Sequence, residues 1–551
     1  MAASDVNSRL KDLHLRFADG EKDARRKSGV WIGRTLADFA RERAAETPDV
    51  IAISDESGGL TYAEFIEQGE ALARGILASG VKPGQTVSFQ LPNWTEAAVV
   101  NVACALAGFV INPVIPIYRQ SELRFILKDC RARMIFIPET FRNIDYPEMI
   151  NGLRVDLPDL NSVVIVRGKS EGQPLYASLI AAGRTSEASL VQSDPDDAKF
   201  ILYTSGTTGQ PKGVIYSHNQ GRRPIWASME AWGLKPGTRL LMPSPLTHVT
   251  GFAYGIEAPF HFGIRTVLME KWDAARAADL IEDEKIDFMV GATPFLQELV
   301  EEAEKRGTPL GSLKIFACGG AAVPPDLIRR ANRVLVNCRT FRVFGSSECP
   351  MVTQGCLDDA ELAATTDGRV YDWDVKVVDA EGTPLASGAE GEILARGPSL
   401  FRGYTDQAAN RDAFDGDGYF RTGDLGIVTA DGLLTITGRK KDIIIRGGEN
   451  LSAKEIEDAL HEHPAIREAA VVAMPHPRLG EGVCAFIIAA GSVAPGQKAL
   501  AAWLKDKGLA PQKWPERIEY VAELPKTASG KVQKHILRKT IGGMLTGEGP
   551  K

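Results

Sequence analysis

The segment from Tyr203 to Gly213 has a composition that suits phosphate binding better than packing. It continues an apolar run, 200–203, that predicts a short buried strand, and it alternates hydroxyl side chains with glycines. Glycine allows turns whose backbone N–H groups converge on an anion, and a nearby lysine adds a positive charge. The sequence therefore predicts a phosphate-binding loop, with the candidate residues Thr204, Ser205, Gly206, Thr207, Thr208, Gly209 and Lys212.

A flexible linker can have a similar composition, but linkers rarely follow a strand directly or end in Pro-Lys-Gly. No Gly-x-x-x-x-Gly-Lys-Ser/Thr pattern occurs in the chain, so the sequence does not support a P-loop NTPase. Residues 203–213 instead resemble the phosphate loop of the adenylate-forming enzymes, which include acyl-CoA synthetases, peptide adenylation domains and luciferases. The pattern as a whole is most similar to AMP-forming acid–CoA ligases of the cyclohexanecarboxylate or aryl-acid type.

The composition of the chain argues against several other classes of protein. Its 551 residues, 44% hydrophobic and 25% charged, are typical of a globular protein with at least two domains. A formal net charge of −7 argues against a general nucleic-acid binder. Seven cysteines without a Cys-x-x-Cys pair, and an N-terminus without an apolar signal segment, predict a cytoplasmic protein with reduced thiols.

Helix and strand patterns alternate along the N-terminal part of the chain. A capping box at Thr61 and Glu64 opens an apolar-periodic helix, and a strand pattern follows at 86–90. The uncharged run 97–118 is interrupted by Asn, Gly and Pro, so we expect a buried helix that leads into a strand rather than a transmembrane segment. This alternation predicts an α/β fold of mostly parallel sheets flanked by helices.

Two changes of pattern divide the chain. From 370 to 437 short alternating strands with Gly turns predict a β-rich subdomain, placed at about 343–438. A charged and Gly-rich segment, 438–450, then has the composition of a hinge that leads into a new domain. The predicted domains are therefore a large N-terminal domain, 1–438, and a small mobile α+β C-terminal lid, 439–551.

Three further segments match nucleotide-binding motifs of the adenylate-forming enzymes. A predicted strand runs into the small residues 319–322, where a flat group could approach the backbone closely. Residues 344–348 match an aromatic-Gly-x-Thr-Glu motif, with Phe and Ser in place of the usual Tyr and Thr. Asp424 follows a glycine, and an Asp in that position is most often a turn residue. The resemblance of residues 419–424 to a motif of the family implies instead that Asp424 binds the ribose. The implied contacts are Gly320, Ala321, Ala322, Phe344 and Gly345 near the adenine, Ser347 at the α-phosphate, Asp424 and Arg439 at the ribose, and Glu348 with Thr204 at Mg²⁺.

His248 follows a strand pattern and a polar turn. A lone histidine near apolar residues is more often a packed structural group, but the family resemblance implies that it lines the acyl pocket and orients the carboxylate. A carboxylic acid is already ionised at neutral pH, so there is less reason for a role as a base. The candidates for the acyl pocket, apolar and bulky as a group, are Trp226, Val249, Phe252 and Gly319, with Phe344 and Trp272 beside them.

The C-terminal segment carries two more motifs. By resemblance, Lys441 is the pivot of the hinge, and Gly447 and Gly448 form part of the pantetheine tunnel of coenzyme A. The run 524–531 ends in Lys531, which matches the catalytic lysine of the family. From Arg439 onward the chain has 18 Lys and Arg against 13 Asp and Glu, which would suit a lid over polyanionic ligands or reflect chance on a solvated surface.

The resemblance implies an AMP-forming acid–CoA ligase that uses ATP, Mg²⁺ and coenzyme A, with Lys531, His248 and Glu348 as catalytic residues. The expected substrate is a compact hydrophobic carboxylic acid: alicyclic, aromatic or of medium chain length. Two alternatives stay open: transfer of the acyl group to a carrier-protein thiol or an amine, and an inactive homologue that only binds ligands. The oligomeric state, including a homodimer, is also left open.

Overall fold

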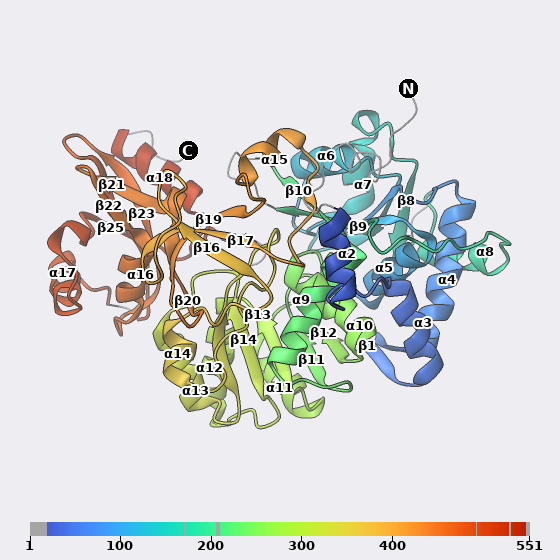
Figure 1. The fold of residues 1–551 in the computed structure, drawn as a ribbon, viewed down its shortest axis with the longest axis horizontal. Coiled ribbons are helices and arrows are strands. Elements are labelled where there is room, and N and C mark those ends of the chain that lie inside the picture. The colour runs from blue at the N-terminus through green and yellow to red at the C-terminus, as the bar shows by residue number, and fades with distance from the viewer. Residues whose placement is uncertain (1–18, 170–171, 205–209, 492, 528–529, 547–551) are drawn as a thin grey trace.

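The computed structural model describes residues 19–169, 172–204, 210–491, 493–527 and 530–546. Over these ranges the strands form two seven-stranded sheets, a four-stranded sheet, a five-stranded sheet and the short hairpin β6 (Thr140–Phe141) and β7 (Ile144–Asp145). Figure 1 shows a large N-terminal body, coloured from blue through yellow to the light orange of α15, and a smaller C-terminal part in darker orange and red beside it. The α/β prediction, with a large N-terminal domain and a C-terminal domain, is confirmed.

The first seven-stranded sheet has the order β15-β14-β13-β11-β12-β1-β2. Its strands are parallel except for the antiparallel pair of β1 and β2. Most of these strands are short apolar runs, as expected for strands that are covered on both faces. The bounds are β1 Ile51–Asp55, β2 Gly58–Thr61, β11 Arg239–Met242, β12 Arg265–Leu268, β13 Phe288–Gly291, β14 Ile315–Gly319 and β15 Arg339–Val343.

The second seven-stranded sheet has the order β18-β10-β9-β4-β3-β5-β8. It is parallel from β9 to β8, whereas β10 pairs antiparallel with both β9 and β18. The segment predicted as the phosphate loop connects β9 to β10, and its residues 205–209 lie outside the described ranges. The bounds are β3 Thr86–Phe89, β4 Val110–Pro113, β5 Met134–Pro138, β8 Ser162–Val166, β9 Ala198–Thr204, β10 Lys212–Ser217 and β18 Gly403–Tyr404.

The helices of the N-terminal body pack on these sheets with apolar stripes. The predicted capping box is present: the Thr61 hydroxyl accepts from Glu64 N, and the Glu64 carboxylate accepts from Thr61 N. The uncharged run is also a buried helix leading into a strand, α5 into β4, as predicted. The bounds are α2 Asp19–Lys27, α3 Leu36–Glu46, α4 Tyr62–Ala78, α5 Thr95–Ala107, α6 Gln120–Asp129, α7 Tyr146–Asn151, α8 Tyr176–Arg184, α9 His218–Ala231, α10 Ala258–Phe262, α11 Ala274–Asp283, α12 Thr293–Arg306, α13 Pro325–Val334, α14 Ala360–Thr365 and α15 Gln407–Ala413.

The four-stranded sheet is antiparallel, in the order β16-β17-β19-β20, and lies in the region where a β-rich subdomain was expected. Its strands are β16 Asp374–Val378, β17 Glu390–Arg396, β19 Phe420–Val428 and β20 Leu434–Arg439. A short 3₁₀ turn, η3 (Lys440–Asp442), follows directly and connects this sheet to the C-terminal part of the chain.

The C-terminal sheet runs β22-β21-β24-β23, with β25 parallel to β24. Alternate residues of β24 point to opposite faces: Val483, Ala485 and Ile487 pack with α16 and α17, whereas Cys484 and Phe486 pack with α18. Helices therefore cover both faces of a sheet that has its own hydrophobic core. The bounds are β21 Ile443–Arg446, β22 Glu449–Ser452, β23 Ile466–His476, β24 Gly480–Ala489, β25 Arg517–Tyr520, α16 Ala453–His461, α17 Gln497–Asp506 and α18 Lys534–Thr546.

Among the described residues, none of the helices has the length and apolar character needed to cross a membrane.

Candidate active site

Parallel strands bring the predicted motifs to one edge of the first seven-stranded sheet. Strands β15, β14, β13 and β11 are neighbours and run in the same direction, so their carboxyl ends meet at this edge. In open α/β sheets, ligands bind outside these ends. The segment after β14 begins with Gly320, the segment after β15 with Phe344, and the segment after β11 leads to His248.

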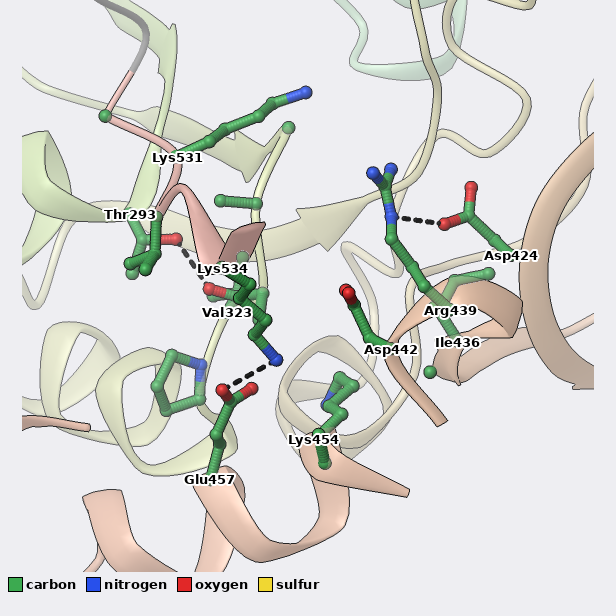
Figure 2. A pocket seen from close by; sticks show the side chains of 18 of the residues that line it. Thr293, Val323, Asp424, Ile436, Arg439, Asp442, Lys454, Glu457, Lys531 and Lys534 are labelled. Atoms are coloured by element: carbon green, nitrogen blue, oxygen red, sulfur yellow. Dashed lines mark hydrogen bonds and ion pairs between the residues drawn. The ribbon is translucent and has the colours of Figure 1, made fainter. Parts of the chain in front are cut away.

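A cavity of about 530 Å³ lies between this edge, the four-stranded sheet and the C-terminal domain. Figure 2 shows how side chains from these parts of the chain point into it. A volume of this size falls in the range of small-molecule sites. The predicted residues that line the cavity are Gly320, Ala321, Ala322, Phe344, Gly345, Asp424, Arg439, Lys441 and Lys531.

Asp424 and Arg439 are directly opposite each other on the antiparallel strands β19 and β20. The Arg439 Nε donates to Asp424 Oδ1 at 2.7 Å, and Figure 2 shows this pair at the cavity wall. Burial raises the pKa of the Asp424 carboxyl, and Arg439 counteracts this shift by favouring the ionised form. Asp424 is thus a buried carboxylate at the cavity with a fixed orientation, as recognition of vicinal hydroxyls would require.

Lys531 extends into the cavity from the C-terminal domain (Figure 2). Its Cε lies 3.9 Å from where a Cβ on Gly320 would be, and Gly320 has a φ of +80° that favours glycine. The pKa of the Lys531 ammonium is lowered to about 8, mainly by burial and also by Arg439, while Asp424 and Glu348 partly offset this shift. Two domains thus bring a cation and its carboxylate neighbours to one place.

Glu348 is held in place by two hydroxyl groups. The Tyr404 hydroxyl donates to Glu348 Oε1 and the Ser346 hydroxyl donates to Oε2, both at 2.9 Å. Tyr404 comes from β18 at the edge of the second sheet, and the Lys212 ammonium lies 5.0 Å from the centre of its ring. Tyr404 was not predicted as a site residue, and its separation from Glu348 by 56 positions left no local signal.

Thr204 and Lys212 are cross-strand neighbours at the end of the β9–β10 hairpin, and they bracket the predicted phosphate loop. The predicted residues Ser205, Gly206, Thr207, Thr208 and Gly209 lie outside the described residues. Ser347 is positioned through its carbonyl oxygen, which accepts from the Tyr216 hydroxyl at 2.8 Å.

His248 lies in a turn that is held in place by hydrogen bonds with the Asn93 side chain. The Asn93 side-chain amide donates to the carbonyl oxygens of Ser244 and Met269, each at 3.0 Å, and its oxygen accepts from Leu246 N at 3.0 Å. Burial lowers the pKa of His248 to about 3, with a further contribution from Lys531. The imidazole is therefore neutral at neutral pH, which suits a role in orienting a carboxylate better than a charged role.

The residues predicted for the acyl pocket are not all in one place. Val249 and Phe252 line a second, very small cavity of about 10 Å³ behind His248. Trp226 instead packs edge-to-face on Phe262, with 5.0 Å between ring centroids, and lines neither cavity within the described residues. Gly319 ends β14, where a Cβ would lie 2.5 Å from the Val343 carbonyl oxygen.

Trp272, the remaining candidate, packs against Phe295 with ring centroids 4.9 Å apart and donates to Glu298 at 2.7 Å. Like Trp226, it is absent from the lining of both cavities in the part of the chain that the structure describes.

The segment predicted as the hinge is anchored on both sides of Lys441. The Lys440 ammonium pairs with Glu392 of β17 at 3.1 Å, which ties it to the N-terminal body. Asp442 pairs with Arg538 of α18 at 3.0 Å, which ties it to the C-terminal domain. Between them, the Lys441 side chain has no ion pair with any described residue.

Gly447 and Gly448 form the exposed turn between β21 and β22, with φ of +60° and +90° that glycine adopts readily. They are not among the described residues that line the cavity with Lys531. In this arrangement of the domains, the predicted catalytic lysine and the predicted CoA-binding glycines therefore lie at different places.

Comparison with known proteins places the chain in a family. Residues 40–405 match the model of the AMP-binding enzymes, and residues 455–531 match the AMP-binding enzyme C-terminal domain. The chain is 37% identical to a medium-chain fatty-acid–CoA ligase of Escherichia coli K12, over 97% of this chain and 95% of that protein. It is 34% identical to the vibriobactin-specific 2,3-dihydroxybenzoate-AMP ligase of Vibrio cholerae, over 93% of this chain and 95% of that protein.

Among solved structures, ATP-bound MatB from Rhodopseudomonas palustris has a TM-score of 0.82 and 26% identity, covering 92% of this chain and 99% of that one. The two family models and the relatives together span most of the chain. The chain therefore belongs to the AMP-binding enzyme family, the adenylate-forming enzymes that its motifs resemble. The predicted resemblance is confirmed, and the protein is an enzyme of this family.

Proposed function

We propose that this protein is an AMP-forming acid–CoA ligase that acts on a compact hydrophobic carboxylic acid. In the first half-reaction, the carboxylate attacks the α-phosphate of ATP and releases pyrophosphate; in the second, the thiol of coenzyme A attacks the acyl-adenylate and releases AMP. The observation that supports this most is that Lys531 extends from the C-terminal domain into the cavity that Asp424 and Arg439 line. These residues provide a cation and a hydroxyl-binding carboxylate, both of which an adenylate needs.

Lys531 would neutralise charge during adenylate formation. A carboxylate and a phosphate repel each other, and a pre-placed ammonium offsets that repulsion in the transition state. The neutral His248 would orient the acid, with Val249 and Phe252 in contact with its apolar part. Phe344, Gly345 and the small residues after β14 would lie along the adenine.

The donor set also fits Mg²⁺, which is commonly bound through one or two carboxylates plus substrate phosphates. Among the described residues there is no cluster of three or more His, Cys, Asp or Glu that could hold a metal alone. Glu348, fixed by Tyr404 and Ser346, would hold the ion together with ATP. Thr204, opposite Lys212 at the start of the phosphate loop, would be the second protein ligand. The ion would supply charge neutralisation at the phosphates.

Replacing Tyr404 with phenylalanine should weaken this proposed Mg²⁺ site. The change removes the donor to Glu348 Oε1, and loss of such supporting bonds costs about tenfold or more in metal affinity. The measurement is the free Mg²⁺ concentration that gives half-maximal pyrophosphate release. Tyr419→Phe, which removes a hydroxyl bonded to Asp374 instead, is the matched control. Equal Mg²⁺ dependence in both variants would count against Glu348 as the ligand.

Adenylate formation should depend on the protonation state of Lys531. Its pKa is lowered to about 8, so the ammonium is present below that pH and is lost as the pH rises through it. We expect kcat/KM for adenylate formation, which reports the free enzyme, to fall above about pH 8. In Lys531→Arg the overall rate should be lower, but the alkaline fall should disappear because a guanidinium stays charged. An unchanged alkaline limb in that variant would assign the titration to another group.

In the second half-reaction the C-terminal domain would rotate about Lys441 and bring Gly447 and Gly448 to the thiol of coenzyme A. The anchors on each side of Lys441 support this pivot, because Lys440 is tied to one domain and Asp442 to the other. We include in the proposal the division at 438/439 and a cytoplasmic location. The latter is supported by seven free cysteines, of which six are buried.

The test is pyrophosphate release with ATP, Mg²⁺ and a panel of acids: acetate, cyclohexanecarboxylate, benzoate, decanoate and palmitate, each with and without coenzyme A. Turnover that requires coenzyme A and peaks on a ring or medium-chain acid is the expected result. Release that stops after about one turnover with or without coenzyme A would favour a carrier-protein thiol or an amine as acceptor. That alternative is supported by the relative named as an AMP ligase. No release with any of the acids would contradict the proposed substrate class.

A further inference from the structure

The small cavity behind His248 leads away from the reacting centre into the N-terminal body. It is lined by Phe200, Tyr216, Val249, Phe252, Glu257 and Pro350, among others. Its near side adjoins the site, because Val249 follows His248 and the Tyr216 hydroxyl donates to the Glu348 carbonyl oxygen at 3.1 Å. At about 10 Å³ it has room for roughly one water, so an acid can enter only if lining side chains move.

The far side of this cavity is formed by Glu257, which belongs to a buried polar cluster. Its carboxylate forms an ion pair with Lys199, accepts from the Asn101 side-chain amide, and lies 3.2 Å from His261 Nε2. All four side chains are 3% exposed or less. We refer to Lys199, Glu257, His261 and Asn101 as the floor cluster.

Two aromatic rings that line the cavity, Phe252 and Phe200, pack against the Lys199 ammonium of the floor cluster. The Lys199 ammonium lies 5.2 Å from the ring centre of Phe252 and 5.4 Å from that of Phe200. Gly221 permits this packing, since a Cβ there would lie 2.7 Å from Phe200 Cε1. An aromatic ring can turn to admit a ligand, but separating a buried ion pair leaves uncompensated charges and is strongly unfavourable.

A π-helical turn places the cluster at this depth. Residues Gly251–Glu257 form η2, whose hydrogen bonds close over five residues rather than four. Glu257 therefore follows Phe252 by one turn of the same helix, and both face the cavity. The π-turn thus aligns an apolar wall residue and a charged end residue along one line leading away from His248.

We propose that the floor cluster closes the acyl pocket and limits the length of the acid that the enzyme accepts. This inference rests on the proposed function. An acid that ends before the cluster is enclosed by Phe200, Val249 and Phe252, whereas a longer chain would press methylene groups against the Lys199–Glu257 ion pair. The pocket therefore favours rings and short to medium chains and excludes long-chain acids.

The test removes both charges but keeps the side-chain length of Glu257 and one oxygen that can accept from Asn101: Lys199→Met together with Glu257→Gln. Replacing a buried ion pair by uncharged residues of similar volume is often tolerated. The readout is kcat/KM for adenylate formation, measured as pyrophosphate release, with hexanoate, octanoate, decanoate, laurate and palmitate. We expect the palmitate-to-octanoate ratio to rise by about tenfold or more. The matched control makes the same two exchanges at a pair in the C-terminal domain, Lys507→Met with Glu462→Gln.

A second measurement uses the unmodified enzyme and does not depend on the folding of a variant. Each acid is compared with the acid of equal length that carries a terminal hydroxyl. For short chains the hydroxyl should lower kcat/KM, because it enters an apolar pocket. As the chain end reaches the floor cluster, this penalty should shrink, since Glu257 can accept from the hydroxyl.

The outcomes separate the two proposals. If the unmodified enzyme adenylates medium-chain acids but the Lys199/Glu257 variant keeps its length preference, or the hydroxyl penalty is the same at all lengths, the floor cluster does not set the limit. The proposed ligase would then stand. If the unmodified enzyme adenylates neither these linear acids nor cyclohexanecarboxylate and benzoate, both proposals fail; if it adenylates only the ring acids, the floor cluster proposal fails and the ligase stands.

Discussion

Replacing Lys531 with alanine should lower the rate of acyl-adenylate formation by a factor of about 10² to 10³, the range seen when one pre-placed group that stabilises transition-state charge is removed. The ammonium lies in the cavity near Asp424, Arg439 and Glu348, and alanine leaves no cation at that position. In contrast, the conversion of supplied acyl-adenylate and coenzyme A into thioester should be largely retained, because the proposed rotation takes Lys531 away in that step.

The two half-reactions are measured separately, as pyrophosphate release in the first and as AMP release from synthetic acyl-adenylate in the second. Lys539→Ala is the control, since Lys539 is an exposed lysine on α18, the helix that begins three residues after Lys531. Equal losses in both half-reactions would show that Lys531 serves the fold or a step common to both. A normal rate of pyrophosphate release in Lys531→Ala would show that Lys531 is not a catalytic residue.

Replacing Arg342 with methionine should destabilise the N-terminal domain by about 3–5 kcal/mol, the cost of leaving one charge of a buried pair without its partner. The Arg342 guanidinium is 2% exposed and donates to both carboxylate oxygens of Asp367, at 3.1 and 2.7 Å. Asp367 also accepts from Ile436 N at 2.8 Å. The pair thereby ties β15, which leads into Phe344, to β20, which carries Arg439.

The measurement is the thermal unfolding midpoint of the full chain, followed by the fluorescence of its tryptophans. Arg329→Met is the matched control, because Arg329 pairs with Glu361 on the surface, where such pairs contribute about 0–1 kcal/mol. Adding Asp367→Asn to Arg342→Met removes the stranded charge and should recover part of the loss. If Arg342→Met and Arg329→Met lower the unfolding midpoint equally, the buried Arg342–Asp367 pair contributes no more to stability than a surface pair.

Much of this site could be predicted because its chemistry is carried by short segments at strand ends. The Gly- and Ala-rich run after β14 and the Phe344–Glu348 run after β15 meet because parallel strands end at one edge, so local patterns and one rule of topology are enough. Asp424 and Arg439 likewise meet because antiparallel pairing sets them opposite each other.

Other parts of the site depend on contacts that no local pattern encodes. Tyr404 reaches Glu348 from another sheet, and Lys199 sits within an apolar strand, where its pairing with Glu257 gives no periodic signal. The position of Trp226 also depends on tertiary packing, in this case against Phe262. The π-turn at Gly251–Glu257 was not predicted either, since a helical pattern in sequence does not distinguish four-residue from five-residue hydrogen bonding.

The two anchors beside Lys441 have a consequence for the maximal rate of the enzyme. If Lys440 stays with one domain and Asp442 with the other, the whole reorientation is concentrated in the backbone dihedrals of a single residue. Its speed is then a property of the protein and is the same for every acid. We therefore expect a shared ceiling: acids that are adenylated faster than the domain turns should all reach the same kcat, and differ only in the concentration at which they reach it.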